Sequence, residues 1–284
     1  MLEEVSFTRK DGQYLRWDHR SARTQVKGSF DKGIIPTFHD AIRRKLDMMV
    51  EDLGTPGLLE RPTGPRGSLD IRQGSCLEIL PEMRACSFDF VVTSPPYCNP
   101  YDYTRTYALE LAFLGLDDEE VKRLRQGLLS CTVENKEKIE QLRRAYSDRR
   151  LGARWSRVDQ TFKRQEAMAE VLVFLENERD RGRLNNPHIA RMVRNYFYEM
   201  CFVIYELSRV LRPGGVIAMV NDNVRYAGRE IPVDLILSDF ANSFGLDVRH
   251  IWALPRGKGN SSQQMGSHGR SELRKCVYVW QKPA

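Results

Sequence analysis

The sequence contains no Cys-x-x-Cys pair, no long apolar run and no charged segment followed by an apolar one at its N-terminus. Its six cysteines are scattered and form no metal-type grouping with the five histidines. These absences argue against a zinc site, a membrane span and a secretory signal peptide. They predict reduced, mostly buried thiols in a cytoplasmic protein.

Basic residues are in modest excess over acidic residues. The 284 residues include 44 Lys and Arg against 38 Asp and Glu, which gives a net charge of +6 and a pI of about 9.0. A basic excess favours a polyanionic partner such as double-stranded DNA, although basic surfaces also serve solubility alone. The length is sufficient for one large domain or two small ones.

The most informative run is Thr93-Ser94-Pro95-Pro96-Tyr97, which directly follows the apolar segment from Phe88 to Val92. Two prolines fix φ and remove backbone donors, so the carbonyl oxygens stay available to other donors. A hydroxyl, a fixed carbonyl and an aromatic face suit a flat nitrogenous ring. The ring would stack on Tyr97, and its exocyclic amino group would donate to Ser94 and to the Pro95 carbonyl. A turn that simply ends a strand, with a packed tyrosine, is the alternative.

This run resembles the catalytic motif of amino-group DNA methyltransferases, in which Asp, Ser or Asn precedes Pro-Pro and an aromatic residue. Upstream, residues 71–81 look like the strand and loop that reach the adenine of S-adenosylmethionine in this superfamily. Downstream, residues 207–221, with Pro213-Gly214-Gly215, are similar to its helix, Pro-Gly-Gly turn and strand. The resemblance implies an α/β, Rossmann-like S-adenosylmethionine-dependent methyltransferase fold with a helical insertion.

The resemblance also implies roles for individual residues. The catalytic set would be Ser94, Pro95, Pro96 and Tyr97, and the residues that bind S-adenosyl-L-methionine would be Gly74, Ser75, Cys76 and Thr93. The enzyme would methylate the exocyclic amino group of a base flipped out of the duplex. Serine at the first motif position favours cytosine N4, with adenine N6 as the alternative. A free nucleotide, RNA or a glutamine side-chain amide also presents a planar amino group.

One expected element is missing from the sequence. Methyltransferases of this class carry a glycine-rich strand-to-helix turn that cradles the cofactor, and no such run stands between Met1 and Gly74. The segments 54–57 and 63–67 are interrupted by proline, and 256–260 lacks a flanking strand and helix pattern. We favour a split enzyme, with this turn on a second polypeptide, over a diverged or truncated copy. A non-catalytic DNA-binding or specificity subunit is the hypothesis from another class.

Composition and periodicity divide the chain into three parts. Residues 1–68 read as an arm, a helix over 36–53 and a linker, while 69–116 and 186–284 would form the methyltransferase catalytic domain. Residues 117–185 predict a helical insertion that is a candidate for DNA recognition. Elements expected in the catalytic part are strands at 69–72, 88–93, 216–220, 247–254 and 275–281, helices at 76–83, 193–211 and 233–244, and polar loops at 221–228 and 257–266.

The insertion is rich in arginine. In this superfamily, insertions near the acceptor motif commonly read the DNA target, and arginine is a common phosphate ligand. Charged residues on helical faces are more often simply solvated surface, which is the alternative for each of them. The candidates for phosphate contacts are Arg143, Arg144, Arg149, Arg150, Arg154 and Arg157.

Overall fold

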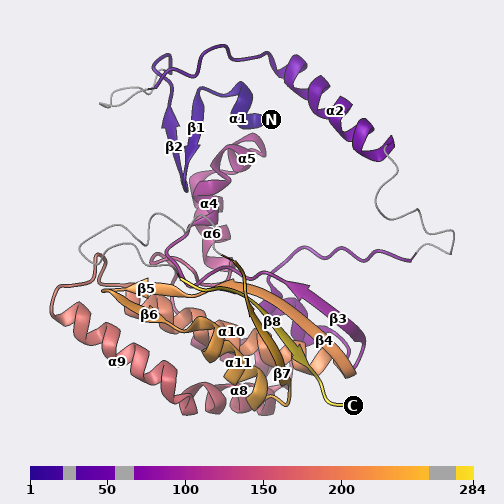
Figure 1. Cartoon of the computed structure of the whole chain (residues 1–284), viewed down its shortest axis with the longest axis vertical. Coiled ribbons are helices and arrows are strands. Elements are labelled where there is room, and N and C mark those ends of the chain that lie inside the picture. The colour runs from indigo at the N-terminus through magenta and orange to yellow at the C-terminus, as the bar shows by residue number, and fades with distance from the viewer. Residues whose placement is uncertain (22–29, 55–66, 256–272) are drawn as a thin grey trace. The chain divides into compact units, whose positions relative to one another are not determined.

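The computed structural model describes residues 1–21, 30–54, 67–255 and 273–284 (Figure 1). The chain divides into two compact units. Unit 1 comprises Met1–Gln73 and Asp102–Arg125, and unit 2 comprises Gly74–Tyr101 and Gln126–Ala284. Segment 256–260, the predicted loop at 257–266 and most of the two proline-interrupted segments lie outside the described residues. Among the helices that are described, none is long and apolar enough to cross a membrane.

Unit 1 begins with regular structure where the sequence predicts an irregular arm. Strands β1 (Thr8–Asp11) and β2 (Tyr14–Trp17) form an antiparallel hairpin, with Gly12 at a positive φ in its two-residue turn. Glycine at the first turn position is typical of a type II′ hairpin, and this is the signal in the sequence that identifies the turn. The other elements of this unit are α1 (Leu2–Val5), α2 (Phe38–Gly54), α4 (Tyr103–Thr106), α5 (Ala108–Phe113) and most of α6 (Asp118–Gly127).

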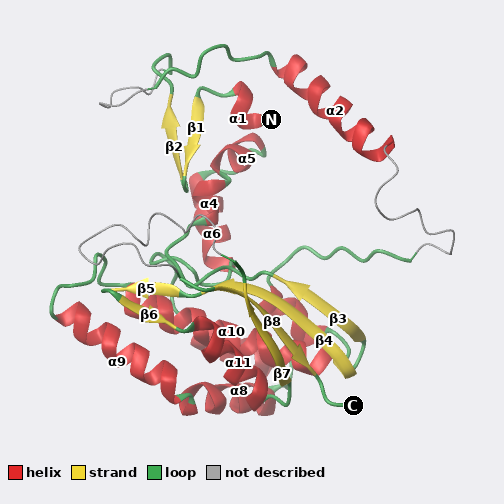
Figure 2. Ribbon diagram, in the orientation of Figure 1, coloured by secondary structure: helices red, strands yellow, loops and turns green. Residues whose placement is uncertain are grey.

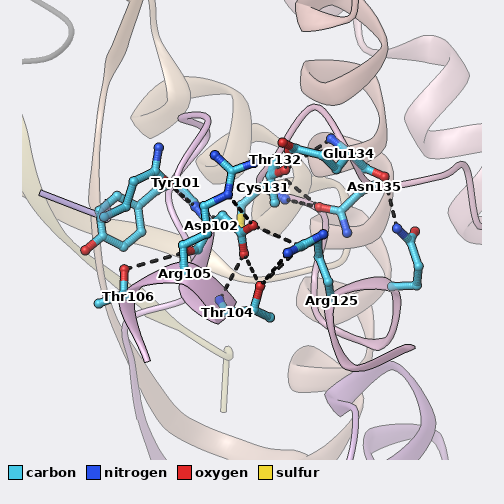
Figure 3. A network of polar contacts seen from close by, with 12 residues as sticks. Tyr101, Asp102, Thr104, Arg105, Thr106, Arg125, Cys131, Thr132, Glu134 and Asn135 are labelled. Atoms are coloured by element: carbon cyan, nitrogen blue, oxygen red, sulfur yellow. Dashed lines mark hydrogen bonds and ion pairs between the residues drawn. The ribbon is translucent and has the colours of Figure 1, made fainter. Parts of the chain in front are cut away.

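A buried carboxylate organises the part of unit 1 that follows the Pro-Pro motif in sequence. Asp102 is the N-cap of α4 and accepts from the Thr104 backbone N–H at 2.9 Å and from the Thr104 hydroxyl at 2.6 Å. The guanidinium of Arg125, on α6, lies 2.9 Å from its second oxygen (Figure 3). Capping and charge neutralisation together therefore fix the start of α4 against α6.

Unit 2 contains a four-stranded sheet in the order β3-β4-β8-β7 (Figure 2). β3 and β4 are parallel, whereas β8 pairs antiparallel with both β4 and β7. The predicted α/β class is confirmed. β3 and β8 have the predicted bounds, and β4 extends further in both directions than predicted. The strands are β3 (Phe88–Thr93), β4 (Leu211–Asp222), β7 (Asp247–Ala253) and β8 (Lys275–Gln281).

One face of this sheet forms the core. Alternate residues of β4 and β8, among them Met219, Tyr278 and Trp280, are completely buried in a cluster with helices α10 (Ile189–Val210) and α11 (Val233–Ser243). The Trp280 indole donates to the Ser238 hydroxyl of α11 at 3.1 Å. Burial of such alternating side chains contributes roughly 2 kcal/mol each, so the sheet and α10 stabilise one another.

The opposite face of the sheet is more open. Phe90 and Val92 point to it from β3 and are 58% and 69% exposed. Their neighbours in register on β4 are Val216 and Ala218, which are half-buried. β3 is also an edge strand of the sheet as far as the described residues go. An apolar strand with one unpaired edge therefore borders an apolar face.

The predicted insertion is helical, but the strand predicted at 69–72 is wrong. Residues 69–72 form no strand, and Leu69 and Ile71 are exposed, because a strand requires a neighbour to hydrogen-bond with, and among the described residues β3 pairs with β4 alone. The helix predicted at 76–83 is confirmed as α3 (Cys76–Ile79), which continues as the 3₁₀ turn η1 (Leu80–Glu82). The insertion comprises α6, α7 (Ile139–Asp148), α8 (Gly152–Arg164) and α9 (Glu166–Asp180), of which α7 to α9 belong to unit 2.

Candidate active site

The Pro-Pro loop emerges at the carboxyl end of β3. Thr93 ends that strand and pairs with Met219 of the parallel strand β4, which continues to Asp222. In a parallel pair both carboxyl ends lie at the same edge, where open α/β sheets bind their ligands. The edge therefore holds the loop that begins at Ser94 and the polar residues Asp222 and Asn223.

The loop presents acceptor groups that the described protein leaves unused. Ser94 is exposed, Pro96 and Tyr97 are half-buried, and Pro95 is buried. Neither the Ser94 hydroxyl nor the Pro95 carbonyl hydrogen-bonds to a residue that the structure describes. A hydroxyl, a carbonyl and an aromatic ring are thus available together within four consecutive residues. That this loop binds a planar amino group stays a prediction.

The residues after the motif are held in place. The Asn99 backbone N–H donates to the Tyr97 carbonyl at 2.7 Å, and the Tyr101 N–H donates to the Asn99 carbonyl at 2.7 Å. Cys98 is completely buried, and its carbonyl accepts a hydrogen bond of 2.8 Å from the Tyr226 hydroxyl. The loop is consequently anchored on its C-terminal side, directly after Tyr97.

A buried tyrosine from the long helix α10 lies close to this anchor. The Tyr196 hydroxyl accepts from the Asn221 amide at 2.7 Å, and both side chains are buried. Burial raises the pKa of Tyr196 well above its ordinary value, and the nearby Cys98 thiol adds to this effect. The tyrosine therefore stays neutral, and its hydroxyl bond ties α10 to the end of β4.

Asp222 is the acidic group at this edge. One of its carboxylate oxygens is buried and bonded to no described residue. Desolvation raises the pKa of Asp222, and Lys275, its neighbour in register on β8, opposes that shift. The sequence predicts a polar loop at 221–228. The structure instead puts Asn221 and Asp222 in β4 and builds a hairpin from β5 (Val224–Tyr226) and β6 (Arg229–Ile231), so this prediction is wrong.

The candidate cofactor residues belong to unit 2, but they do not form one contiguous turn. Ser75 precedes α3. Gly74 has φ of 152°, and a Cβ added at this position would lie only 3.0 Å from the Ile79 side chain. Burial raises the pKa of the Cys76 thiol to about 11, and the charge of Glu199 adds to this shift. No hydrogen bond joins this segment to Thr93 in the described part of the chain.

Five of the six arginines proposed for DNA contact have side-chain partners within the described protein. Arg143 and Arg144 both pair with Glu140 on the exposed face of α7, at 2.8 and 2.9 Å. These two side chains hold the pKa of the Glu140 carboxyl down at about 2. The pair lies on solvent-exposed surface, which agrees with the alternative of a solvated helical face.

The remaining arginines of this set lie between α7 and α8 or on α8. Arg149 pairs with Glu82 at 2.9 Å, and Arg154 donates to the Pro81 carbonyl at 3.4 Å, so both lie beside the segment that precedes β3. Arg157 lies over the rings of Tyr205 and Phe244, and Arg150 is exposed with a positive φ. Arg149 and Arg154 lie near the amino end of β3, whereas the Pro-Pro loop follows its carboxyl end. The strand between these two ends spans about 20 Å.

One cluster in unit 1 combines groups that can bind metals. Ligand atoms of Asp18, His19 and Asp31 lie within 4.8 Å of one another. The buried Asp18 carboxylate already accepts from the Arg20 guanidinium at 2.7 Å and from the Lys32 backbone N–H at 2.7 Å. Protein donors thus already hold this carboxylate.

No protein-family model matches the chain. The type II methyltransferase M.AvaI of Nostoc sp. (strain PCC 7120) is 51% identical over 286 residues, which cover all of this chain and 57% of that protein. The type II methyltransferase M.BsoBI of Geobacillus stearothermophilus is 43% identical over 297 residues, which cover all of this chain and 58% of that protein. Along its whole length, the chain is similar to type II methyltransferases.

The chain spans somewhat more than half the length of these curated relatives. Among solved structures, a Thermus thermophilus protein provisionally assigned as a DNA modification methylase, in complex with S-adenosyl-L-methionine, aligns with a TM-score of 0.32 at 14% identity. That alignment covers 74% of this chain and 52% of the other.

Proposed function

We propose that this chain supplies the base-binding part of a site-specific DNA methyltransferase. The enzyme would transfer a methyl group from S-adenosyl-L-methionine to the exocyclic amino group of a flipped base, with cytosine N4 favoured and adenine N6 as the alternative. The observation that carries this proposal is the loop Ser94–Tyr97, whose acceptors are free of described protein donors at the carboxyl edge of the sheet. Similarity to type II methyltransferases along the whole chain supports the same function.

The residues of the loop act on the amino group itself. The nitrogen lone pair of cytosine N4 or adenine N6 is delocalised into the ring, so the amino group is a poor nucleophile. When Ser94 and the Pro95 carbonyl each accept one N–H, the nitrogen moves toward tetrahedral geometry and its lone pair becomes localised. Stacking on Tyr97 holds the base outside the duplex while this happens, and such a contact contributes about 1–3 kcal/mol.

S-adenosyl-L-methionine, when bound, supplies the methyl group. The residues of this chain proposed to contact it are Gly74, Ser75, Cys76 and Thr93, but these residues form no glycine-rich turn that could enclose a whole cofactor. We therefore propose that the turn belongs to a second polypeptide, as in a split enzyme. The open edge of β3 and the exposed side chains of Phe90 and Val92 support this assignment, because a parallel edge strand can accept a further strand.

Replacing Val92 by lysine is expected to weaken binding of the second polypeptide at least tenfold while the chain stays folded, because this side chain is 69% exposed. Isothermal titration calorimetry with the partner measures the change. Val173→Lys is the matched control, since Val173 is 58% exposed on α9, away from β3. Equal affinities for the two variants would contradict a docking site at the β3 edge.

The proposed function is tested by methyl transfer from labelled S-adenosyl-L-methionine to unmethylated DNA, with this chain alone and with the polypeptide that carries the glycine-rich turn. Digestion of the DNA to nucleosides then separates N4-methylcytosine from N6-methyladenine. Transfer only in the mixture supports the split enzyme, and transfer by the chain alone removes the need for a partner. DNA binding without transfer in either sample would instead favour a non-catalytic specificity subunit.

DNA contact by the six arginines remains a proposal, and the exposed pair Arg143 and Arg144 offers a direct test of it. Arg143→Ala with Arg144→Ala is expected to lower the slope of log affinity against log salt by about one for each phosphate that an arginine no longer neutralises. Stability should hardly change, because the pair with Glu140 is exposed. Arg179→Ala with Arg181→Ala is the control, since these arginines also pair with acidic neighbours on a helix end. Identical salt slopes for both double variants would exclude Arg143 and Arg144 from the DNA interface.

A further inference from the structure

The hairpin β5–β6 is built as a rigid element beside the Pro-Pro loop. Val224 pairs with Ile231 and Tyr226 with Arg229, and the two-residue turn Ala227-Gly228 has φ of 46° and 78°. Positive φ at both positions is the requirement of a type I′ turn, which matches the twist of the strands that it joins. Alanine tolerates this conformation poorly, so the surrounding structure must hold it.

A polar cluster around the buried side chains of Asn223 and Asp234 fixes the base of the hairpin. The Asn223 amide donates to Glu230 at 2.7 Å, and its side-chain oxygen accepts from the Asp234 backbone N–H at 3.0 Å. The Asn223 backbone N–H donates to the Arg274 carbonyl at 2.9 Å, and the Arg274 guanidinium lies 3.0 Å from Asp234. The hairpin is thereby joined to the start of α11 and to the segment that leads into β8.

Tyr226 is the side chain of the hairpin that the described structure bonds to Cys98, directly after the Pro-Pro loop. Its hydroxyl donates to the Cys98 carbonyl at 2.8 Å, and both residues are buried. Burial raises the pKa of Tyr226 well above its ordinary value, so the hydroxyl keeps its proton and remains a donor. Pro95 and Pro96 have no N–H to donate, so the loop depends on bonds made from outside for its position.

We propose that the hydrogen bond between Tyr226 and the Cys98 carbonyl, here termed the Tyr226 tether, positions Ser94, Pro95 and Tyr97 for the amino group of the flipped base. This proposal rests on the proposed function and assigns Tyr226 as a positioning residue. Cys98 directly follows Tyr97, so a shift of its carbonyl turns the stacking ring. The two prolines then transmit the shift to the Pro95 carbonyl, because their fixed φ angles leave the intervening backbone little freedom to absorb it.

The tether is first tested without any activity measurement. In the folded chain, iodoacetamide reaches the thiol of Cys98 only when the loop opens, and it reaches Cys201 only when α10 opens. Tyr226→Phe is expected to raise the alkylation rate of Cys98 about tenfold relative to Cys201, the factor for removal of one buried hydrogen bond. Tyr278→Phe is the matched control, because the Tyr278 hydroxyl is equally buried but bonded to no described residue.

An unchanged Cys98 rate in Tyr226→Phe would overturn the tether, as would equal increases at Cys98 and Cys201, which report general unfolding. In the active assembly, the single-turnover rate of methyl transfer should fall about tenfold in Tyr226→Phe with unchanged DNA affinity, while Tyr278→Phe matches the wild type. A wild-type rate in Tyr226→Phe would overturn the positioning role. No transfer by the wild-type assembly would reject the proposed function, and the thiol rates would still decide whether the tether holds the loop.

Discussion

Ser94→Ala is expected to lower the rate of methyl transfer about 100-fold or more, with little change in folding stability. The Ser94 side chain is exposed and makes no hydrogen bond to a described residue, so the fold loses nothing when its hydroxyl is removed. The proposed reaction loses one of the two acceptors that localise the nitrogen lone pair, an effect comparable with removal of one preorganised hydrogen-bonding group elsewhere. Single-turnover methyl transfer at saturating DNA measures this effect.

Two comparisons make the Ser94 result specific. Ser87→Ala removes a hydroxyl at the opposite end of the same strand, where it donates to the Arg84 carbonyl at 2.6 Å, and should leave the rate unchanged. Ser94→Thr keeps the hydroxyl and should retain much more activity than Ser94→Ala. If Ser94→Ala transfers methyl groups as fast as Ser87→Ala, the serine is not an acceptor, and the Pro-Pro run merely ends a strand.

Tyr97 distinguishes binding of the base from activation of its amino group. Tyr97 is half-buried, so one part of its ring packs against the protein while another part remains accessible. Ser94 acts on the nitrogen, whereas Tyr97 acts on the ring to which that nitrogen is attached. Loss of the serine should therefore affect the chemical step, and loss of the aromatic ring should first affect how long the base stays flipped.

The sequence predicts best those helices and strands in which packing against the core gives the buried residues a regular spacing. The helix α10 is buried along most of its length and shows the helical spacing expected for 193–211. In β8, buried and half-buried residues alternate from Cys276 to Gln281, and its predicted bounds are those of the structure. The Pro-Pro loop is recognisable in the sequence because its residue types, rather than its contacts, indicate chemistry.

The contacts and strands that the sequence does not predict correctly depend on interactions between residues far apart in the chain. The Tyr226 hydroxyl reaches a carbonyl 128 positions away, and its strand of three residues is too short to show an alternating pattern. Residues 69–72 present the opposite case. Leu69 and Ile71 alternate as a strand would, but strand formation depends on a neighbour, and the described chain places none there.

Loss of a buried ion pair gives the largest stability effect that we expect. The Lys138 ammonium lies 3.0 Å from the Glu199 carboxylate, and both side chains are almost completely buried. Lys138→Met should cost about 3–5 kcal/mol, because it leaves the Glu199 charge inside unit 2 without a cation. Urea unfolding followed by far-ultraviolet circular dichroism measures this loss as a lower midpoint at an unchanged slope.

The second substitution decides whether the unpaired Glu199 charge or the lost hydrogen bonds of the Lys138 ammonium cause the loss. Glu199 also accepts from the Ser130 backbone N–H at 2.8 Å, and a glutamine in its place can still accept this bond. Lys138→Met with Glu199→Gln should therefore recover at least about half of the lost stability, since no uncompensated charge remains. If the double variant is as unstable as Lys138→Met alone, the lost hydrogen bond from the Lys138 ammonium to the Leu128 carbonyl is responsible rather than the unpaired charge. Recovery would show that the unpaired Glu199 charge causes the loss. The ion pair joins the segment before α7 to α10, whose Tyr196 is bonded to Asn221 beside the Pro-Pro loop.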